Sequence, residues 1–301
     1  MKQVDFTIVT PSFRQLKWLE LCIASVADQD GVSVEHIVQD GGTEGFGAFA
    51  QEMADRWPDK PGYRRTMTSE KDGGMYDAVN QGLRKGMAPF CAYLNCDEQY
   101  LPGTLGQILR IFKTQPATDI IFGGVLIINP DGSLISARRP VRLYGPHVAT
   151  CHLPNFTCAM FFRRELLSRQ GAWFDSRWRD CADALWVMDR LKNKTTIDRC
   201  MDFVTAFADT GHNMNLSPNA LEEARKIRGA VPVFWRWLRS FWVLWHWLGK
   251  LFDGSYWPRR LTYAIYTFDS AGKRTKICGQ TANPFWIARW FVRERLALRP
   301  R

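Results

Sequence analysis

The order of strand-like and helical runs in the first hundred residues constrains the fold most strongly. Apolar runs such as DFTIVT, HIVQD and FCAYLN are typical of buried strands, and helical spacing of apolar residues lies between them over 14–27 and 75–85. A further short strand is predicted around YRRTMTS, after a loop that holds Pro58 and Pro61. Strands that alternate with helices predict an α/β fold, in which right-handed crossovers build a parallel sheet.

The pattern changes in the next hundred residues, where strands and helices are more segregated. A helix is predicted over 105–114, and DIIFGGVLII followed by PDGSLIS is typical of a hairpin that closes at Asp131 and Gly132. NFTCAMFF and MDFVTAFAD are predicted as strands, and CADALWVMDRL as a short amphipathic helix. We therefore expect a second half, over 101–224, that is built onto the first half, over 1–100.

Polar clusters follow three of the predicted strands. They are Thr10-Pro11-Ser12, Asp40-Gly41-Gly42 and Asn95-Cys96-Asp97-Glu98. Because ligands of open α/β sheets bind beyond the carboxyl ends of the strands, these clusters are candidate binding residues. An ordinary polar loop presents similar residues, so the convergence of three clusters on one sheet edge is the stronger signal.

Asp97 and Glu98 form a carboxylate pair at a predicted strand end. Such a pair suits Mg²⁺ or Mn²⁺, because these hard cations prefer oxygen ligands and often complete their shell with substrate phosphates. The fragment SEKDGGMYDAVNQG precedes the pair, with Asp72 before two glycines and Asn80 in the first turns of a predicted helix. Acids at such a place are also typical of a helix start that the dipole favours.

The ordered series TPSF, QDGGTEG, SEKDGGMYDAVNQG and YLNCDE resembles the family-two inverting glycosyltransferases with the GT-A fold. The later segments GAWFDSRW and CADALWVMDRL are similar to segments of that family, so the resemblance covers about residues 4–215. It implies an α/β GT-A fold, a Rossmann-like nucleotide-binding mixed sheet flanked by helices, followed by a C-terminal amphipathic helical extension. It also implies one catalytic domain over 1–224, with a nucleotide-sugar half over 1–100 and an acceptor half over 101–224.

The resemblance implies roles in binding a nucleotide-sugar donor. One group of residues would shape the nucleotide pocket: Thr10, Pro11 and Ser12. Asp40 would hydrogen-bond the base, most naturally a uracil or similar ring N–H, which makes UDP the favoured carrier. Asp72 would contact the nucleoside, and Asn80 would support that region.

The resemblance also implies catalytic roles. Asp97 would hold Mg²⁺ or Mn²⁺ on the donor diphosphate, and Asp183 would be the general base that deprotonates the acceptor hydroxyl. Glu98 replaces the commoner second Asp as a metal residue, which leaves its direct contact with the metal open. Ala184 and Leu185 replace a Tyr-Asp pair of the family pattern, so acceptor contacts there are expected to differ.

Two further residues have competing interpretations. Asp180 is the rival of Asp183 for the role of base, because three residues separate them on nearly the same helical side. His212, in ADTGHNMNLSP, is a candidate metal ligand, since a late-chain histidine sometimes completes the metal shell in GT-A enzymes. A single histidine is more often a surface or hydrogen-bonded residue.

Charge and tryptophan are concentrated in 225–301. This part holds 16 Lys and Arg against 3 Asp and Glu, whereas the first 224 residues hold 24 against 27. It also holds 8 of the 13 Trp. The split predicts a near-neutral catalytic body with a basic, aromatic, helical region at 225–301. The eight Cys form no CxxC pair, which indicates reduced thiols, and the early strand signal argues against a signal peptide.

The segment VFWRWLRSFWVLWHWLGKLF, over 233–252, predicts a helix with one narrow, mostly polar stripe and a broad aromatic face. Trp favours the headgroup boundary and Lys and Arg favour anionic lipid, so we expect this helix to bind an anionic membrane surface. The enzyme is then expected to be cytoplasmic and peripheral on the inner face of the cell membrane. The alternative is packing on the body or on a second copy in a homodimer. No nucleic-acid-binding module accompanies the segment, so nucleic acid is not an expected partner.

These features together predict a metal-dependent, inverting glycosyltransferase of the hexosyltransferase type. Its expected partners are a nucleotide sugar and a lipid-linked saccharide or growing surface glycan. A nucleotidyltransferase is the first alternative, but TPSFRQL lacks the Gly-rich phosphate loop that such an enzyme ordinarily carries after the first strand. The second alternative is a non-catalytic, membrane-tethered nucleotide-sugar-binding protein. A dinucleotide oxidoreductase is disfavoured, because no GxGxxG follows the first strand.

Overall fold

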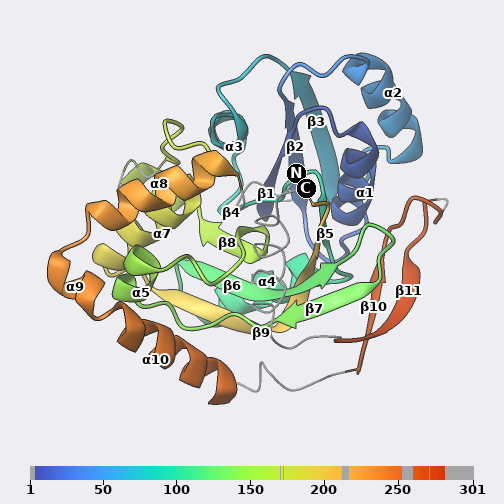
Figure 1. Ribbon diagram of the computed structural model, residues 1–301. Coiled ribbons are helices and arrows are strands. Elements are labelled where there is room, and N and C mark those ends of the chain that lie inside the picture. The colour runs from blue at the N-terminus through green and yellow to red at the C-terminus, as the bar shows by residue number, and fades with distance from the viewer. Residues whose placement is uncertain are drawn as a thin grey trace, which may run out of the picture.

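The computed structural model of the protein describes residues 4–169, 171, 173–211, 217–252, 260–270 and 272–281. Within these residues the chain folds around a mixed, curled sheet of nine strands with helices on both faces (Figure 1). In chain order the strands of the sheet are β1 (Phe6–Ser12), β2 (Val34–Asp40), β3 (Tyr63–Ser69), β4 (Phe90–Tyr93), β5 (Glu98–Tyr100), β6 (Ile120–Ile128), β7 (Leu134–Arg138), β8 (Met160–Arg163) and β9 (Ile197–Ala208). Their order across the sheet is β3-β2-β1-β4-β8-β6-β9-β5, and β7 pairs with β6.

The first half of the chain forms the parallel part of the sheet, as predicted. β1 pairs in parallel with β2 and β4, and β2 pairs in parallel with β3. The register brings Ser12, Asp40 and Ser69 side by side at the carboxyl ends of β1, β2 and β3. Every residue of β1 and β2 is buried, which accounts for the largely apolar runs in the sequence.

The second half of the chain continues the same sheet. β8 is antiparallel to both β4 and β6, β9 is parallel to β6, and β5 is antiparallel to β9. β6 and β7 form the predicted antiparallel hairpin. The predicted halves 1–100 and 101–224 therefore share one sheet, with β4 joined directly to β8 across the boundary.

Two helical layers bury the two faces of the sheet. The helices are α1 (Leu16–Ala27), α2 (Phe46–Arg56), α3 (Met75–Lys85), α4 (Thr104–Thr114), α5 (Gly145–Thr150), α6 (Glu165–Arg169) and α7 (Ala182–Lys192), with a 3₁₀ turn at Thr157–Ala159. Successive strand side chains point to opposite faces, so Ile8 packs with α1 and α4 whereas Val9 packs with α3, α6 and α7. This double-sided burial fixes the carboxyl ends of the strands as one edge of a rigid body.

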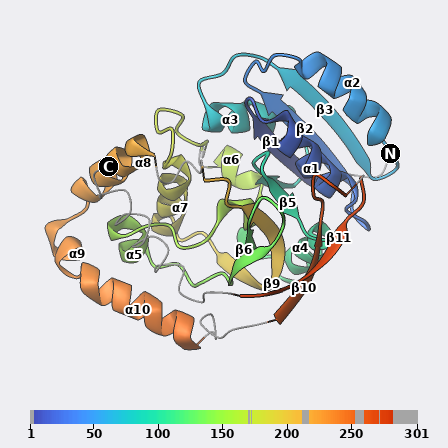
Figure 2. The ribbon, with the colours of Figure 1, turned by 45° about the vertical axis from the view of Figure 1, so that its right-hand side comes forward.

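The C-terminal region differs from the prediction of a helical appendage over 225–301. Three helices come first: α8 (Pro218–Gly229), α9 (Val233–Trp237) and α10 (Arg239–Phe252). They follow one another around one side of the molecule and along its edge in both views (Figures 1 and 2). The strands β10 (Arg260–Ile265) and β11 (Thr275–Gln280) then form an antiparallel hairpin. The helical prediction is therefore right for 233–252 except for the break at Leu238, and wrong for 260–280.

The hairpin of β10 and β11 is part of the body. Arg274 donates to both carboxylate oxygens of Asp28 at the end of α1, at 2.5 and 2.7 Å. The side chain of Gln99 on β5 exchanges two hydrogen bonds of 2.9 Å with the backbone of Tyr266. Charge-assisted, largely buried contacts of this kind hold the hairpin against the rest of the protein, although 225–301 carries a net positive charge.

Other differences are local. The loop expected before Pro58 contains α2, and the helix expected over 14–27 begins at Leu16. Glu98 lies in the short strand β5, which the sequence did not predict, because its backbone pairs with the distant strand β9. All eight cysteines are free, as expected. Across the described ranges, each helix is either too short or too polar to cross a membrane.

Candidate active site

Asp97 and Glu98 lie at the carboxyl end of β4, where a tight turn leads into β5. Both oxygens of Glu98 accept hydrogen bonds from Asn95, one from its backbone N–H at 2.7 Å and one from its side-chain amide at 3.2 Å. Burial, and then the charge of Asp97, raise the pKa of Glu98, and burial raises the pKa of Asp97. Glu98 therefore holds the turn that presents the Asp97 carboxylate.

Asp183 lies in the first turn of α7, on the other side of the same region. Its Oδ1 accepts a hydrogen bond from the backbone N–H of Ala184 at 2.7 Å. Burial raises the pKa of Asp183 to about 6, against the opposing effects of the Ala184 amide and the hydroxyl of Tyr76. The charge of Asp183 also contributes to the raised pKa values of Glu98 and Tyr93. A carboxylate with a pKa near neutrality is suited to accept a proton from an alcohol.

Asp40 lies at the end of β2 between Ser12 and Ser69. Its Oδ2 accepts from the backbone N–H groups of Gly42 and Thr43, at 3.0 and 2.6 Å, and from the hydroxyl of Ser69 at 2.7 Å. Its Oδ1 accepts only from the hydroxyl of Thr43, at 2.6 Å. The carboxylate organises the loop after β2, and Oδ1 retains capacity for a further donor.

Phe13 and Asp72 approach each other beside Gly41, just beyond the carboxyl ends of β1, β2 and β3. A Cβ atom on Gly41 would lie 3.1 Å from Oδ2 of Asp72 and 3.1 Å from the ring of Phe13, so the absent side chain lets these two residues approach. The Phe13 ring is about half exposed, and the guanidinium of Arg14 lies 4.8 Å from its centroid. An exposed aromatic ring beside a carboxylate is suited to receive a planar base. Phe13 was not predicted as a site residue, although it directly follows the TPS of the motif.

Four other predicted residues, Thr10, Pro11, Ser12 and Asn80, are buried. The Thr10 side chain points into the core, where its hydroxyl lies 2.9 Å from Nε2 of His36. Pro11 is buried in β1, and the buried hydroxyl of Ser12 has no hydrogen-bond partner. Asn80 donates to the carbonyl of Phe174 at 2.7 Å and accepts from its N–H at 3.1 Å. Asn80 thus ties α3 to the segment that precedes α7, which agrees with a supporting role.

The two candidate bases, Asp180 and Asp183, have different hydrogen-bond partners. Oδ2 of Asp180 accepts from the hydroxyl of Ser217 at 2.6 Å and from the side-chain amide of Asn219 at 2.8 Å. These bonds hold the Asp180 carboxylate at the start of α8, whereas Oδ1 of Asp183 accepts from the backbone of Ala184. The role of Asp183 as the base stays a prediction. His212 lies outside the described residues.

The oxygen donors in the turn that holds Asp97 suit a hard divalent cation. Asp97 follows Asn95 in the turn after β4, and the buried Oδ1 of Asn95 has no hydrogen-bond partner among the described residues. No group of three or more His, Cys, Asp or Glu side chains within the described ranges is arranged to hold a metal ion. One or two protein ligands are enough for Mg²⁺ or Mn²⁺, because substrate phosphates and water complete the coordination shell.

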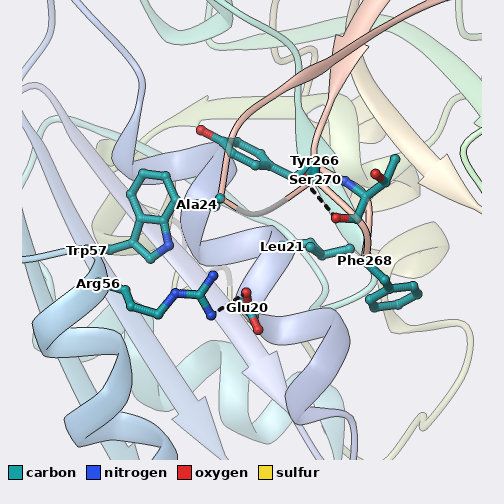
Figure 3. Close-up of a pocket in the computed structure, with 10 residues that line it drawn as sticks. Glu20, Leu21, Ala24, Arg56, Trp57, Tyr266, Phe268 and Ser270 are labelled. Atoms are coloured by element: carbon teal, nitrogen blue, oxygen red, sulfur yellow. Dashed lines mark hydrogen bonds and ion pairs between the residues drawn. The ribbon is translucent and has the colours of Figure 1, made fainter.

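A separate pocket of about 220 Å³ lies between α1, the end of α2 and the loop after β10 (Figure 3). Arg56 and Glu20 form an ion pair of 2.7 Å on its wall, and Trp57 meets Tyr266 edge to face with ring centroids 5.6 Å apart. None of the predicted site residues lines this pocket. It is therefore distinct from the candidate active site.

Part of the predicted polar stripe of 233–252, namely Val243, His246 and Lys250, faces the body of the protein, whereas Arg236 and Arg239 are exposed. His246 is 9% exposed and stacks on His147 of α5, with ring centroids 4.5 Å apart. Lys250, one turn later, is half-buried, and burial lowers its pKa to about 7. The opposite face is exposed and apolar, most strongly at Trp237 (84%) and Phe252 (85%). A helix of a water-soluble protein normally shows the reverse arrangement.

We call this exposed face the aromatic surface. It comprises the exposed apolar side chains of α9 and α10: Val233, Phe234, Trp235, Trp237, Phe241, Leu244, Trp245, Trp247, Leu248, Leu251 and Phe252. A contiguous apolar face of this kind marks a surface that binds another apolar surface.

Comparison with known proteins identifies similar sequences and folds. The family described as Glycosyl transferase family 2 matches residues 7–171. The PGL/p-HBAD biosynthesis glycosyltransferases of Mycobacterium bovis and Mycobacterium tuberculosis are 24% identical over 205 residues, which cover 67% of this chain and 75% of theirs.

Two solved structures share the fold at low sequence identity. S. aureus TarS 1–349 in complex with UDP-GlcNAc has a TM-score of 0.57 and 17% identity, over 74% of this chain and 65% of that chain. The mannosyltransferase PcManGT from Pyrobaculum calidifontis, in complex with GDP-Man and Mn²⁺, has a TM-score of 0.55 and 17% identity, over 75% and 61%. The chain thus spans less than two thirds of each solved chain. The mixed sheet flanked by helices is the GT-A-like fold of these glycosyltransferases.

Proposed function

The chain belongs to glycosyl transferase family 2, and from this premise we propose that it is a metal-dependent, inverting glycosyltransferase. Its donor is a nucleotide sugar, with a UDP-sugar favoured, and its acceptor is a hydroxyl of a lipid-linked saccharide or surface glycan. The observation that carries the proposal is a group of acids that act on one another: the charges of both Asp97 and Asp183 raise the pKa of Glu98, which lies in the short strand after the β4 turn. Family membership also favours sugar transfer over nucleotidyl transfer.

The donor would lie along the edge formed by β1, β2 and β3. Phe13 offers a face for the base, and Oδ1 of Asp40 and the carboxylate of Asp72 offer acceptors for ring or ribose donors. The similar TarS and PcManGT structures are complexes with UDP-GlcNAc and GDP-Man, which supports a nucleotide-sugar donor for this chain.

Asp97, with Oδ1 of Asn95 from the same turn, would hold Mg²⁺ or Mn²⁺, and His212 remains a proposed third ligand. When bound, the cation supplies positive charge that offsets the negative charge developing on the departing diphosphate. Glu98 keeps the turn in place through its two bonds to Asn95. The Mn²⁺ in the PcManGT complex supports this choice of cation.

Asp183 acts on the acceptor. Its carboxylate accepts the proton of the acceptor hydroxyl while that oxygen forms a bond to the anomeric carbon. The bond from the anomeric carbon to the nucleotide oxygen breaks on the opposite face, and its electron pair leaves with the nucleoside diphosphate. One displacement of this kind inverts the anomeric configuration. The Ala184 N–H, donating to Oδ1, fixes the orientation of the base.

A panel of nucleotide sugars tests the proposal. Purified protein is screened for thermal stabilisation and for release of nucleoside diphosphate, with Mn²⁺, with Mg²⁺ and with chelator. We expect one donor to stabilise the protein and to turn over only with the cation. D183N should keep donor binding and lose at least about 10²-fold in turnover, since the base is removed, whereas D180N should lose less turnover than D183N. Full turnover in D183N would refute the proposed role of Asp183, and donor binding without any turnover in wild type would favour the non-catalytic alternative.

The aromatic surface supports the membrane part of the proposal. A lipid bilayer accepts Trp, Phe and Leu at its interface, and Arg236 and Arg239 beside them are exposed to meet anionic headgroups. We propose that this surface holds the enzyme on the cytoplasmic face of the cell membrane, next to a lipid-linked acceptor. A second copy of the chain is the competing occupant of the same surface.

Vesicle flotation separates the two occupants. We expect binding to vesicles that contain an anionic phospholipid, weaker binding to neutral vesicles, and a loss of at least about tenfold when Trp237 and Phe252 are both changed to Ser, because each buried aromatic side chain contributes about 1.5–3 kcal/mol. Met87, which is 77% exposed elsewhere on the protein, provides the matched control in M87S. If the double variant binds vesicles as wild type does but no longer dimerises in ultracentrifugation, the surface is a homodimer interface.

A further inference from the structure

Glu223 of α8 binds the backbone that leads into the helix of the proposed base. One carboxylate oxygen accepts from the N–H of Arg179 at 2.8 Å, and the other accepts from the N–H groups of Asp180 and Cys181, both at 3.0 Å. The Glu223 residue is only 6% exposed. Although burial opposes it, the backbone donors of Arg179 and Asp180 keep the pKa of Glu223 below its ordinary value, so the carboxylate is charged at neutral pH.

These three N–H groups lie directly before α7, which begins at Ala182. The helix has no side-chain cap of its own, because Cys181 at the cap position accepts no hydrogen bond from the first turn. Glu223, about 40 residues later in the chain, instead binds the backbone of the cap residue Cys181 and of the two residues before it. A negative charge at a helix start is favourable, and here it also fixes the direction in which the helix begins.

A second set of contacts ties the same segment to the start of α8. Asn219 donates to Oδ2 of Asp180 at 2.8 Å and to Glu223 at 3.0 Å, and Ser217 donates to Oδ2 of Asp180 at 2.6 Å. The hydroxyl of Ser217 in turn accepts from the N–H of Ala220, as the cap of α8. Glu223 is therefore one member of a closed network in which every bond joins α8 to the segment before α7 or stays within α8.

We propose that Glu223 is a positioning residue for the general base Asp183. This inference rests on the proposed function of Asp183. Asp183 is the second residue of α7, two positions beyond the last N–H that Glu223 holds, so a shift of this segment moves the base directly. A misplacement of a catalytic group by about 1 Å can lower the rate by about 10²-fold.

The test compares two neighbouring glutamates. E223Q keeps the size of the side chain but turns an N–H₂ group toward backbone N–H donors, so it breaks at least part of the clamp. E222Q is the matched control, because Glu222 is exposed and pairs only with Lys226 in the next turn, at 2.7 Å. Hydrogen–deuterium exchange over 179–182, thermal stability, donor KM, kcat and its pH profile are measured for both variants, with D183N in parallel. The donor is the one that the nucleotide-sugar panel identifies.

We expect E223Q to lower kcat by about 10- to 100-fold, with donor KM within about twofold, because the three N–H groups that Glu223 binds belong to the segment before α7 and not to the donor edge of β1–β3. Amide exchange over 179–182 should rise, and the acid limb of the kcat profile should move to lower pH as water reaches Asp183. E222Q should match wild type in every readout. A purely structural role for Glu223 would lower stability without moving the pH profile.

Wild-type kcat and pH profile in E223Q, with raised amide exchange, would overturn the inference. If E223Q does not fold, E223D is measured instead, because it keeps the negative charge but has a shorter side chain. Lowered kcat, raised amide exchange and a shifted pH profile in E223D would support the inference, and a wild-type kcat would overturn it. D183N distinguishes a failure of the proposed base from a failure of the positioning role of Glu223. Retained turnover in D183N would refute the proposed base itself, whereas lost turnover in D183N with full turnover in E223Q would refute only the positioning role.

Discussion

The raised pKa of Asp183 predicts that its ionised carboxylate supports activity at neutral pH but lowers the stability of the fold. Burial raises this pKa from 3.8 to about 6, so about one tenth of the base is ionised at pH 5 and about nine tenths at pH 7. We therefore expect kcat to fall about tenfold between pH 7 and pH 5. A carboxylate with an ordinary pKa would lose only about 5% of its ionised form over the same range.

The same shift weakens the fold at neutral pH. Asp183 binds a proton more tightly in the folded than in the unfolded protein, so its penalty grows as the pH rises from about 4 to 6 and is fully present above 6. A shift of about two pKa units corresponds to at most about 3 kcal/mol, and the partial exposure of Asp183 reduces this to about 1–3 kcal/mol. D183N removes the charge, and its amide oxygen can still accept the Ala184 N–H.

D183N should therefore be inactive yet more stable than wild type by about 1–3 kcal/mol at pH 7.5, and the difference should vanish near pH 4. Denaturant unfolding at both pH values measures this, and the comparison of the two proteins isolates Asp183 from Asp97 and Glu98. D180N is the control, because Asp180 is held by Ser217 and Asn219 and its removal should destabilise the fold. A D183N protein less stable than wild type at pH 7.5, or a kcat constant from pH 7 to 5, would refute the reasoning.

Three further predictions follow from the same geometry. D97N should lose turnover by at least about 10²-fold and lose its response to Mn²⁺, as measured by nucleoside diphosphate release, and unchanged metal activation would contradict the assignment. F13A should raise donor KM by about 5- to 100-fold, since base stacking contributes about 1–3 kcal/mol; an unchanged KM would place the base elsewhere. G82A should destabilise the fold by about 1–3 kcal/mol, because its Cβ would lie 2.4 Å from Cγ1 of Val9, whereas G249A, which has open space within α10, should stabilise the fold by about 0.5–1 kcal/mol in the same unfolding assay.

Much of the catalytic body could be predicted from local sequence. β3 and α3 have the predicted bounds, and β1, β2 and β4 lie within two residues of them, because buried strands and amphipathic helices leave a periodic apolar pattern. The carboxyl-end clusters also fall on one edge, since parallel pairing fixes where such ends meet. α2 was missed, and only Phe46 and Met53 of its apolar residues are buried.

The site residues stay predictions, and the structure adds contacts around them that the sequence does not show. The motifs singled out Asp40, Asp97 and Asp183, yet the sequence does not reveal that Asp40 is held by the Ser69 hydroxyl. Nor does the sequence separate Asp180 from Asp183, because both acids have similar neighbours along the chain. Only the position of α8 shows that one of them is held at the start of that helix.

The sequence by itself determined the α/β class, the family and the acids that gather at the sheet edge, because periodicity and motif order are local properties of the chain. The tertiary structure alone decided that His246 of α10 turns inward against His147 of α5, and that Glu223 grips the segment before Asp183. Both depend on contacts between residues about 40 to 100 positions apart. Such contacts follow from how the layers pack, which no short stretch of sequence records.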